Sequence, residues 1–146
     1  MVIGVGNRFR SDDGAGPAVA DRLREHGLDV VELSGDGTEL MQAWEDADHV
    51  IVIDAARSGA PAGTIHKFDA NCTEVPSGLF NYSSHQFSVA EAIEMARVLK
   101  SLPPKMGVYG IEGKDFSYGQ ELSPEVEGAL DTLTQMILGD MEHQTE

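Results

Sequence analysis

Two adjacent aspartates follow a glycine-rich turn near the start of the chain, in the stretch GVGNRFRSDDGAG (residues 4–16). A phosphate-binding loop offers backbone N–H groups and the positive end of a helix to its ligand, and the carboxylates of Asp12 and Asp13 would repel that ligand. A dinucleotide-binding fingerprint also needs a third glycine at the position that Phe9 occupies. The motif therefore argues against a flavodoxin-like nucleotide binder, which stays as one alternative.

The two aspartates have different expected roles. We expect Asp12 to cap the helix that follows, because an aspartate accepts hydrogen bonds from the N–H groups of a first helical turn. Asp13 then has no structural role of its own. Its carboxylate is available for acid–base chemistry or for binding a cation.

A third acid, Asp54, lies near the end of the apolar stretch HVIVIDAA (residues 49–56). A carboxylate in such surroundings is costly unless it is paired or coordinates a cation. Ligands of open α/β sheets bind outside the carboxyl ends of the strands, so Asp13 and Asp54 converge there if the first and third strands are neighbours. The alternative is that Asp54 caps a turn together with Arg57.

Among the five histidines, His85 stands in a loop (SSHQF) directly ahead of a predicted helix. The others lie at a predicted helix end, beside or within strands, or in the C-terminal tail. Two carboxylates and one imidazole form a plausible ligand set for a divalent metal with open coordination positions. Asp13, Asp54 and His85 are therefore the candidate metal ligands.

The elements that position these residues alternate between strands and helices. Ser88 and Glu91 form a capping box, and Thr38 and Ser123 are the expected caps of two other helices. A strand at 64–68 follows its predecessor too closely for a parallel crossover and is expected to be antiparallel. The expected strands are 2–5, 29–34, 49–56, 64–68 and 105–112, and the helices begin near residues 14, 38, 88 and 124.

This alternation predicts a three-layer α/β/α sandwich around a twisted, mostly parallel five-stranded sheet with one antiparallel strand. We expect one domain over residues 1–146, with a flexible tail from 139 to 146. The net charge of −15 argues against nucleic acid as a partner. It favours solubility or, as an alternative, an acidic face for a basic partner.

No apolar run approaches the ~20 residues of a membrane span, and no signal-peptide pattern is expected at the start of the chain. The single cysteine, Cys72, excludes an intrachain disulfide framework and suits a reducing compartment. Composition therefore predicts a cytoplasmic protein without membrane attachment.

Taken together, GVGNRFRSDDGAG, the strand end VIVIDA and SSHQF resemble the three signature regions of the hydrogenase maturation proteases. The resemblance also includes GDGTEL after the second strand and VYGIEG in the fifth. It implies an endopeptidase that removes the C-terminal extension of a nickel–iron hydrogenase large-subunit precursor after nickel insertion. Asp13, Asp54 and His85 match the family's nickel-recognising residues, and the resemblance gives them the catalytic and metal-binding roles.

The chemistry of the sequence is consistent with this resemblance. The chain has neither a GxSxG elbow nor an HExxH motif, so a serine hydrolase and a thermolysin-like zinc enzyme are not expected. Three separated ligands would bind a metal weakly alone, so we expect the nickel to arrive in the precursor. The alternative is a module that senses or delivers nickel without cleaving anything.

Overall fold

The computed structural model describes residues 1–80 and 86–142. At its centre is a five-stranded sheet with the order β2-β1-β3-β5-β4. β4 at one edge is antiparallel to β5, and the other neighbours are parallel. The strands are β1 (Val2–Val5), β2 (Val30–Leu33), β3 (His49–Ala56), β4 (Ile65–Asp69) and β5 (Lys105–Glu112). The predicted sheet, including its antiparallel strand, is confirmed.

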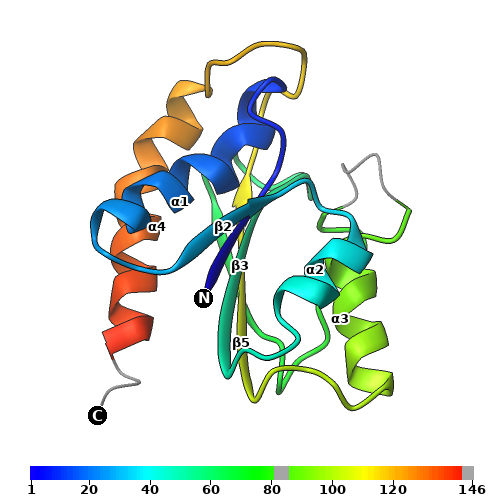
Figure 1. Cartoon of the computed structure of the whole chain (residues 1–146). Helices are drawn as coiled ribbons and strands as arrows, with labels where there is room; N and C mark the ends of the chain where they lie inside the picture. Colours follow the sequence, from blue (N-terminus) through cyan, green and yellow to red (C-terminus); the bar gives the residue numbers. More distant parts are fainter. Residues whose placement is uncertain (81–85, 143–146) are drawn as a thin grey trace.

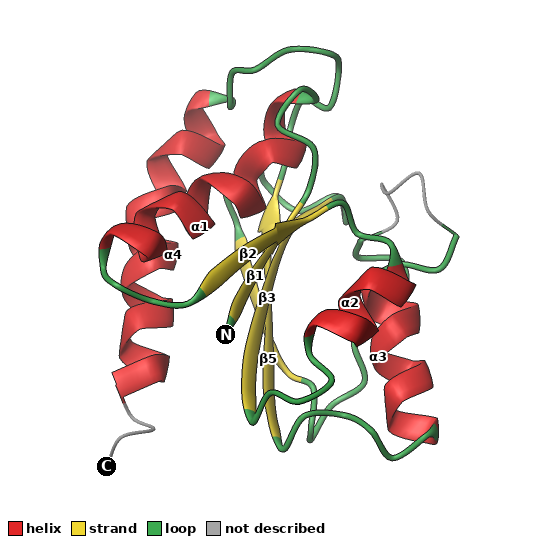
Figure 2. Ribbon diagram, viewed as in Figure 1, coloured by secondary structure: helices red, strands yellow, loops and turns green. Residues whose placement is uncertain are grey.

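Helices cover both faces of this sheet (Figure 1). Figure 2 shows α1 and α4 on one face and α2 and α3 on the other. They are α1 (Ala15–Glu25), α2 (Gly37–Ala43), α3 (Val89–Val98) and α4 (Pro124–Glu142). The predicted three-layer sandwich is therefore confirmed. The predicted tail is corrected at its start, because residues 139–142 belong to α4; residues 143–146 lie outside the described part.

β3 is buried on both faces, which explains its apolar sequence. Val50 and Val52 pack in the cluster beneath α2 and α3, while Ile51 and Ile53 pack in the cluster beneath α1 and α4. A strand that is covered by helices on both sides reads as a continuous apolar run rather than an alternating one. Asp54 comes directly after this run in β3 and is buried as well.

All four predicted helix starts are correct to within one residue, but the predicted cap of α2 is wrong. The capping box of Ser88 and Glu91 is present at the start of α3. α2, however, is capped by Asp36, whose carboxylate accepts a hydrogen bond from the backbone N–H of Thr38 at 3.2 Å. The N–H of Gly37 donates to the carbonyl of Phe87 at 2.7 Å, which ties the start of α2 to the segment before α3.

Asp12 does not cap α1, contrary to the prediction, because a short 3₁₀ turn (η1, Ser11–Gly14) separates it from that helix. Its carboxylate is fully buried and accepts hydrogen bonds from three backbone N–H groups. The donors are Lys114 at 2.7 Å, Asp115 at 2.9 Å and Ser123 at 2.7 Å. Asp12 therefore holds the segment between β5 and α4 against the loop after β1.

Gly6 and Gly16 let this loop and the start of α1 pack against the strand ends. Gly6 has a φ of +148°, and a Cβ there would lie 1.9 Å from the carbonyl oxygen of Asp13. A Cβ at Gly16 would lie 2.4 Å from the Val5 carbonyl oxygen and 2.6 Å from that of Ile53. The glycine-rich stretch therefore serves close backbone packing, which brings the helix start onto β1 and β3.

We expect Asp12→Asn to destabilise the fold strongly. The amide retains one oxygen acceptor but turns an N–H₂ group toward backbone donors, and each unsatisfied buried group costs about 1–3 kcal/mol. The free energy of unfolding, measured by urea denaturation, should fall by about 2–4 kcal/mol. Asp46→Asn, the same change at an exposed aspartate, is the control and should be neutral. Equal stability of the two variants would contradict the role given to Asp12.

Candidate active site

The candidate site lies where the order of the strands reverses. β1 has β2 on one side and β3 on the other, and its last pair with β3 joins Gly4 to Ile53. Asp54 is the next residue of β3, just beyond this last pair, and it lies opposite Gly110 of β5. The carboxyl end of β1 therefore leaves an opening beside Asp54, which is the place where open α/β sheets bind ligands.

Asp13 reaches the same opening from the loop after β1. One oxygen of its carboxylate accepts a hydrogen bond from the backbone N–H of Asn7 at 3.0 Å. Asn7 is itself held by a hydrogen bond of 2.9 Å from the N–H of Phe9 to its side-chain oxygen. The loop thus fixes the direction of the Asp13 side chain through its own backbone.

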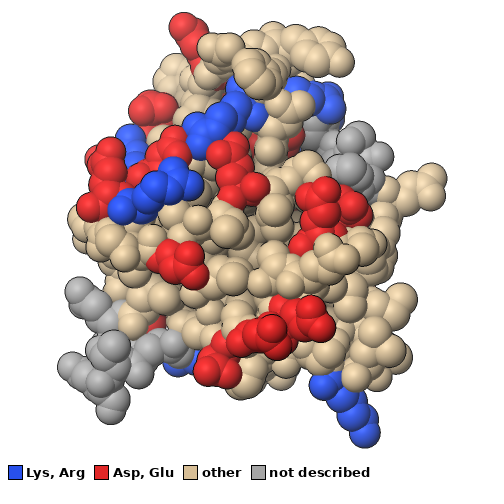
Figure 3. Space-filling model, in the orientation of Figure 1, with Lys and Arg blue, Asp and Glu red and all other residues tan. Residues whose placement is uncertain are grey.

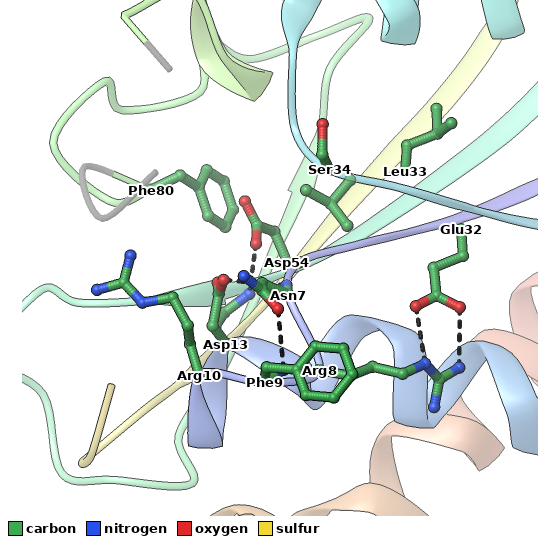
Figure 4. A pocket seen from close by; sticks show the side chains of 13 residues that line it. Asn7, Arg8, Phe9, Arg10, Asp13, Glu32, Leu33, Ser34, Asp54 and Phe80 are labelled. Atoms are coloured by element: carbon green, nitrogen blue, oxygen red, sulfur yellow. Dashed lines mark hydrogen bonds and ion pairs between the residues drawn. The ribbon is translucent and has the colours of Figure 1, made fainter. Parts of the chain in front are cut away.

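Asp13 and Asp54 line one hollow of about 510 Å³. Figure 4 shows their carboxylates in the same space, with Phe80 and Arg10 nearby. Phe80 packs over Gly110, where a Cβ would lie 3.2 Å from its ring. The convergence of the two carboxylates that was predicted from the strand order is therefore present in the structure, and an aromatic ring forms part of their surroundings.

The electrostatics of the pair follow from burial and like charge. Asp54 is only 6% exposed, and burial followed by the nearby charge of Asp13 raises the pKa of its carboxyl well above the usual value. Burial also raises the pKa of Asp13, opposed by the Asn7 hydrogen bond and the charge of Arg10. Two carboxyls with raised pKa values in one hollow can exchange a proton or bind a cation that relieves their repulsion.

The alternative in which Asp54 caps a turn does not hold. β3 continues through Ala56, so Asp54 lies within the strand, and its carboxylate accepts a hydrogen bond of 2.8 Å from the N–H of Ala55. His85, the third predicted residue, lies outside the described residues. Among the residues that the structure describes, no group of three or more His, Cys, Asp or Glu could hold a metal ion. The three-ligand set therefore stays a prediction.

Arg8 is a further feature of this hollow that the sequence reasoning missed. Its guanidinium makes paired contacts with Glu32 of β2 at 2.8 and 2.9 Å and with Asp21 of α1 at 2.8 and 2.9 Å. These bidentate contacts, visible in part in Figure 4, tie the loop after β1 to its two neighbouring elements. The two arginines of NRFR, between the glycines and the aspartates, were the available sequence signal.

Glu112 at the end of β5 is a third buried acid, besides Asp12 and Asp54, and it was not predicted from the sequence. It accepts hydrogen bonds from the N–H and hydroxyl of Ser58 at 2.8 and 2.6 Å, and it lies 3.0 Å from Nε2 of His66. Burial alone would raise its pKa, but the hydrogen bonds from Ser58 and His66 lower the pKa below the usual value. Glu112 is thus a satisfied structural acid, unlike Asp54.

The raised pKa of Asp54 predicts that this carboxylate costs stability. The folded protein holds the Asp54 proton more tightly than the unfolded chain, so stability falls as pH rises above the ordinary value of 3.8 toward the raised folded value. Asp54→Asn should therefore raise the free energy of unfolding at neutral pH, by about 1.4 kcal/mol for each pH unit of this window, and Tm should rise with it. The gain should vanish as the pH falls to the ordinary carboxyl value.

Thermal unfolding of both proteins between acidic and neutral pH measures this effect, with Asp46→Asn as the exposed control. A Tm difference that does not change with pH, or a less stable Asp54→Asn protein at neutral pH, would contradict the electrostatic account of the pair.

None of the described helices combines the length and the apolar character that crossing a membrane requires. Figure 3 shows acidic side chains spread over the face in view, and most of its Lys and Arg side chains lie in the upper part, interspersed with acidic ones.

The sequence is similar to those of known proteins. The profile of the hydrogenase maturation protease family matches residues 18–140. A putative hydrogenase maturation protease of Methanocaldococcus jannaschii is 31% identical over 97% of this chain and 95% of its own length. The hydrogenase expression/formation protein HupD of Thiocapsa roseopersicina is 27% identical over 94% of this chain, which spans only 65% of that relative.

Among solved structures, the hydrogenase maturating endopeptidase HybD from E. coli shares the fold with a TM-score of 0.80. It is 20% identical, and the alignment covers 98% of this chain and 91% of that one. The profile match and the archaeal relative establish the family, as the resemblance of the three sequence motifs predicted. This chain belongs to the hydrogenase maturation proteases, a family of hydrolases of the endopeptidase class.

Proposed function

We propose that this protein removes the C-terminal extension of a nickel–iron hydrogenase large-subunit precursor, and that it recognises nickel already held by the precursor. The observation that carries the proposal is the convergence of Asp13 and Asp54 in one hollow beside the end of β1. Family membership supplies the reaction class, and the two carboxylates supply the groups that it needs.

The charge of the pair explains why a metal-bearing substrate would be selected. Burial and mutual repulsion disfavour two ionised carboxylates in this hollow, as the raised pKa values of Asp13 and Asp54 indicate. A cation that arrives with the precursor removes the repulsion and gains the two carboxylates as oxygen ligands. An empty precursor brings no cation and so leaves the repulsion in place. His85 adds an imidazole to this proposed ligand set.

The nickel itself would be held mainly by thiolates of the precursor, which are softer and stronger ligands for it than two carboxylates. Docking through nickel would place the scissile peptide bond near the pair. A carboxylate oxygen of Asp13 or Asp54 that does not ligate the nickel takes a proton from the attacking water, the water oxygen bonds to the peptide carbonyl carbon, and the C–N bond breaks. The proton passes to the leaving amine.

The proposal predicts that only the nickel-loaded precursor is shortened. Wild-type protein is incubated with nickel-free and nickel-loaded precursor, and mass spectrometry follows the loss of the C-terminal extension. A protein that only senses or delivers nickel would leave both masses unchanged. Equal cleavage of the loaded and empty precursors would show that nickel is not the recognition signal, and the roles of Asp13, Asp54 and His85 would be withdrawn.

The same assay tests the individual residues. Asp13→Asn and Asp54→Asn keep the side-chain shape but remove the negative charge, so we expect cleavage to fall by about 10²–10⁴-fold with the fold retained. His85→Ala should weaken recognition of the loaded precursor and create no activity on the empty one. Asp46→Asn is the control for charge and should cleave normally. If Asp54→Asn cleaves the loaded precursor at the wild-type rate, Asp54 has a structural role and not a catalytic one.

A further inference from the structure

A second hollow, of about 380 Å³, adjoins the candidate site. We call it the basic hollow, and it is lined by Arg10, Arg57, Lys114, Asp115, Phe116 and Tyr118 together with Ser117. Arg10 also lines the hollow that contains Asp13 and Asp54. The two hollows therefore meet at Arg10, and a chain that leaves the carboxylate pair can continue past this residue.

The walls of the basic hollow are fixed by the backbone. Arg10 pairs with Gly119 in an isolated bridge. The N–H of Ser11 donates to the Gly119 carbonyl at 2.8 Å, and the N–H of Gly119 donates to the carbonyl of Phe9 at 2.9 Å. The buried carboxylate of Asp12 anchors Lys114 and Asp115 of the opposite wall. The basic side chains are thus presented from a preformed framework.

The charge of the basic hollow is opposite to that of the protein. The whole chain has 10 Lys and Arg against 25 Asp and Glu. Three of these basic residues line this one hollow, together with a single acid, Asp115. The Asp115 carboxylate accepts hydrogen bonds from the N–H and hydroxyl of Ser117 at 2.9 and 2.7 Å, while Lys114 lies 3.1 Å from Glu125 at its rim. The lining thus carries more cationic than anionic side chains, which favours an anionic group there.

Aromatic rings support the two arginines. Arg10 lies over the ring of Tyr118 at 5.9 Å, and Arg57 over that of Phe116 at 5.8 Å. A guanidinium that contacts an aromatic face keeps a planar fork that matches a carboxylate. Tyr118 of the basic hollow is 90% exposed, and Phe9, which is 61% exposed, lines the neighbouring hollow of the carboxylate pair. Exposed aromatic residues beside arginine are typical of surfaces that bind a polypeptide.

We propose that the basic hollow binds a carboxylate of the precursor's C-terminal extension, and that Arg57 holds this carboxylate. This inference rests on the proposed function. The substrate is a polypeptide, whose anionic groups are acidic side chains and the terminal carboxylate. An acidic segment would be repelled by most of this protein's surface, so the basic hollow gives it one favourable place beside the carboxylate pair.

The test compares steady-state cleavage of nickel-loaded precursor by wild type and Arg57→Glu. Loss of a charge-assisted contact should raise KM by at least ~10-fold and leave kcat within about twofold. Arg57→Lys, which keeps the charge but loses the planar fork, should give a KM between those of wild type and Arg57→Glu. Lys105→Glu makes the same charge change at an exposed position at the opposite end of β5 and is the matched control. Thermal unfolding checks that all three variants fold.

Two further arms identify the source of the carboxylate. In one, the acidic residues of the precursor's extension are replaced by Asn and Gln; in the other, a synthetic extension peptide with a free or an amidated C-terminus competes for cleavage. If neutralising one kind of carboxylate abolishes the difference between wild type and Arg57→Glu, that kind of carboxylate is the one that the basic hollow binds. If neither neutralisation does so, or if the KM of Arg57→Glu equals that of Lys105→Glu, the inference is wrong.

Binding of the free extension peptide, measured by calorimetry, separates this inference from the proposed function. Weaker binding to Arg57→Glu than to wild type supports the basic hollow even if wild type fails to cleave the precursor. Normal cleavage by wild type together with equal peptide binding by both proteins would overturn the inference and leave the proposed function standing.

Discussion

Two carboxylates that repel each other lie together at the carboxyl edge of the sheet, and the rest of the fold has to hold them there. Asp54 is buried at the end of an apolar strand, and Asp13 is brought against it by the loop after β1. Their repulsion is opposed by the N–H of Asn7, the N–H of Ala55 and the charge of Arg10. The fold must supply enough stability elsewhere to keep this arrangement, because the pair itself opposes folding at neutral pH.

Comparison with the other buried acids identifies which carboxylates serve the fold. Asp12 accepts hydrogen bonds from three backbone N–H groups, and Glu112 accepts them from Ser58 and lies beside His66. Both acids hold loops in place near the site. Asp54 has a weaker set of donors and a neighbour of like charge. A buried acid of this second kind is poised for a cation or a proton, which is why the proposed chemistry is assigned to Asp13 and Asp54.

Much of this arrangement could be predicted from local patterns. The apolar stretch HVIVIDAA predicted strand β3, and the short connection before β4 predicted its antiparallel direction. Adjacency of β1 and β3 predicted the meeting of Asp13 and Asp54. The role of Asp12 could not be predicted, because its partners lie 102 to 111 residues further along the chain. The cap at Asp36 was missed for a related reason: Asp36 and Thr38 are both good capping residues, and a contact between Gly37 and Phe87 accompanies the observed start.

The central claim is that Asp13 and Asp54 ligate nickel that the precursor carries. X-ray absorption at the nickel edge tests it most directly, on nickel-loaded precursor alone and on the same sample mixed with this protein and frozen before cleavage is complete. We expect light oxygen or nitrogen scatterers to join the sulfur ligands of the nickel when wild-type protein is added, and Asp13→Asn to reduce this gain. A nickel coordination shell that is the same with and without the protein would contradict the account.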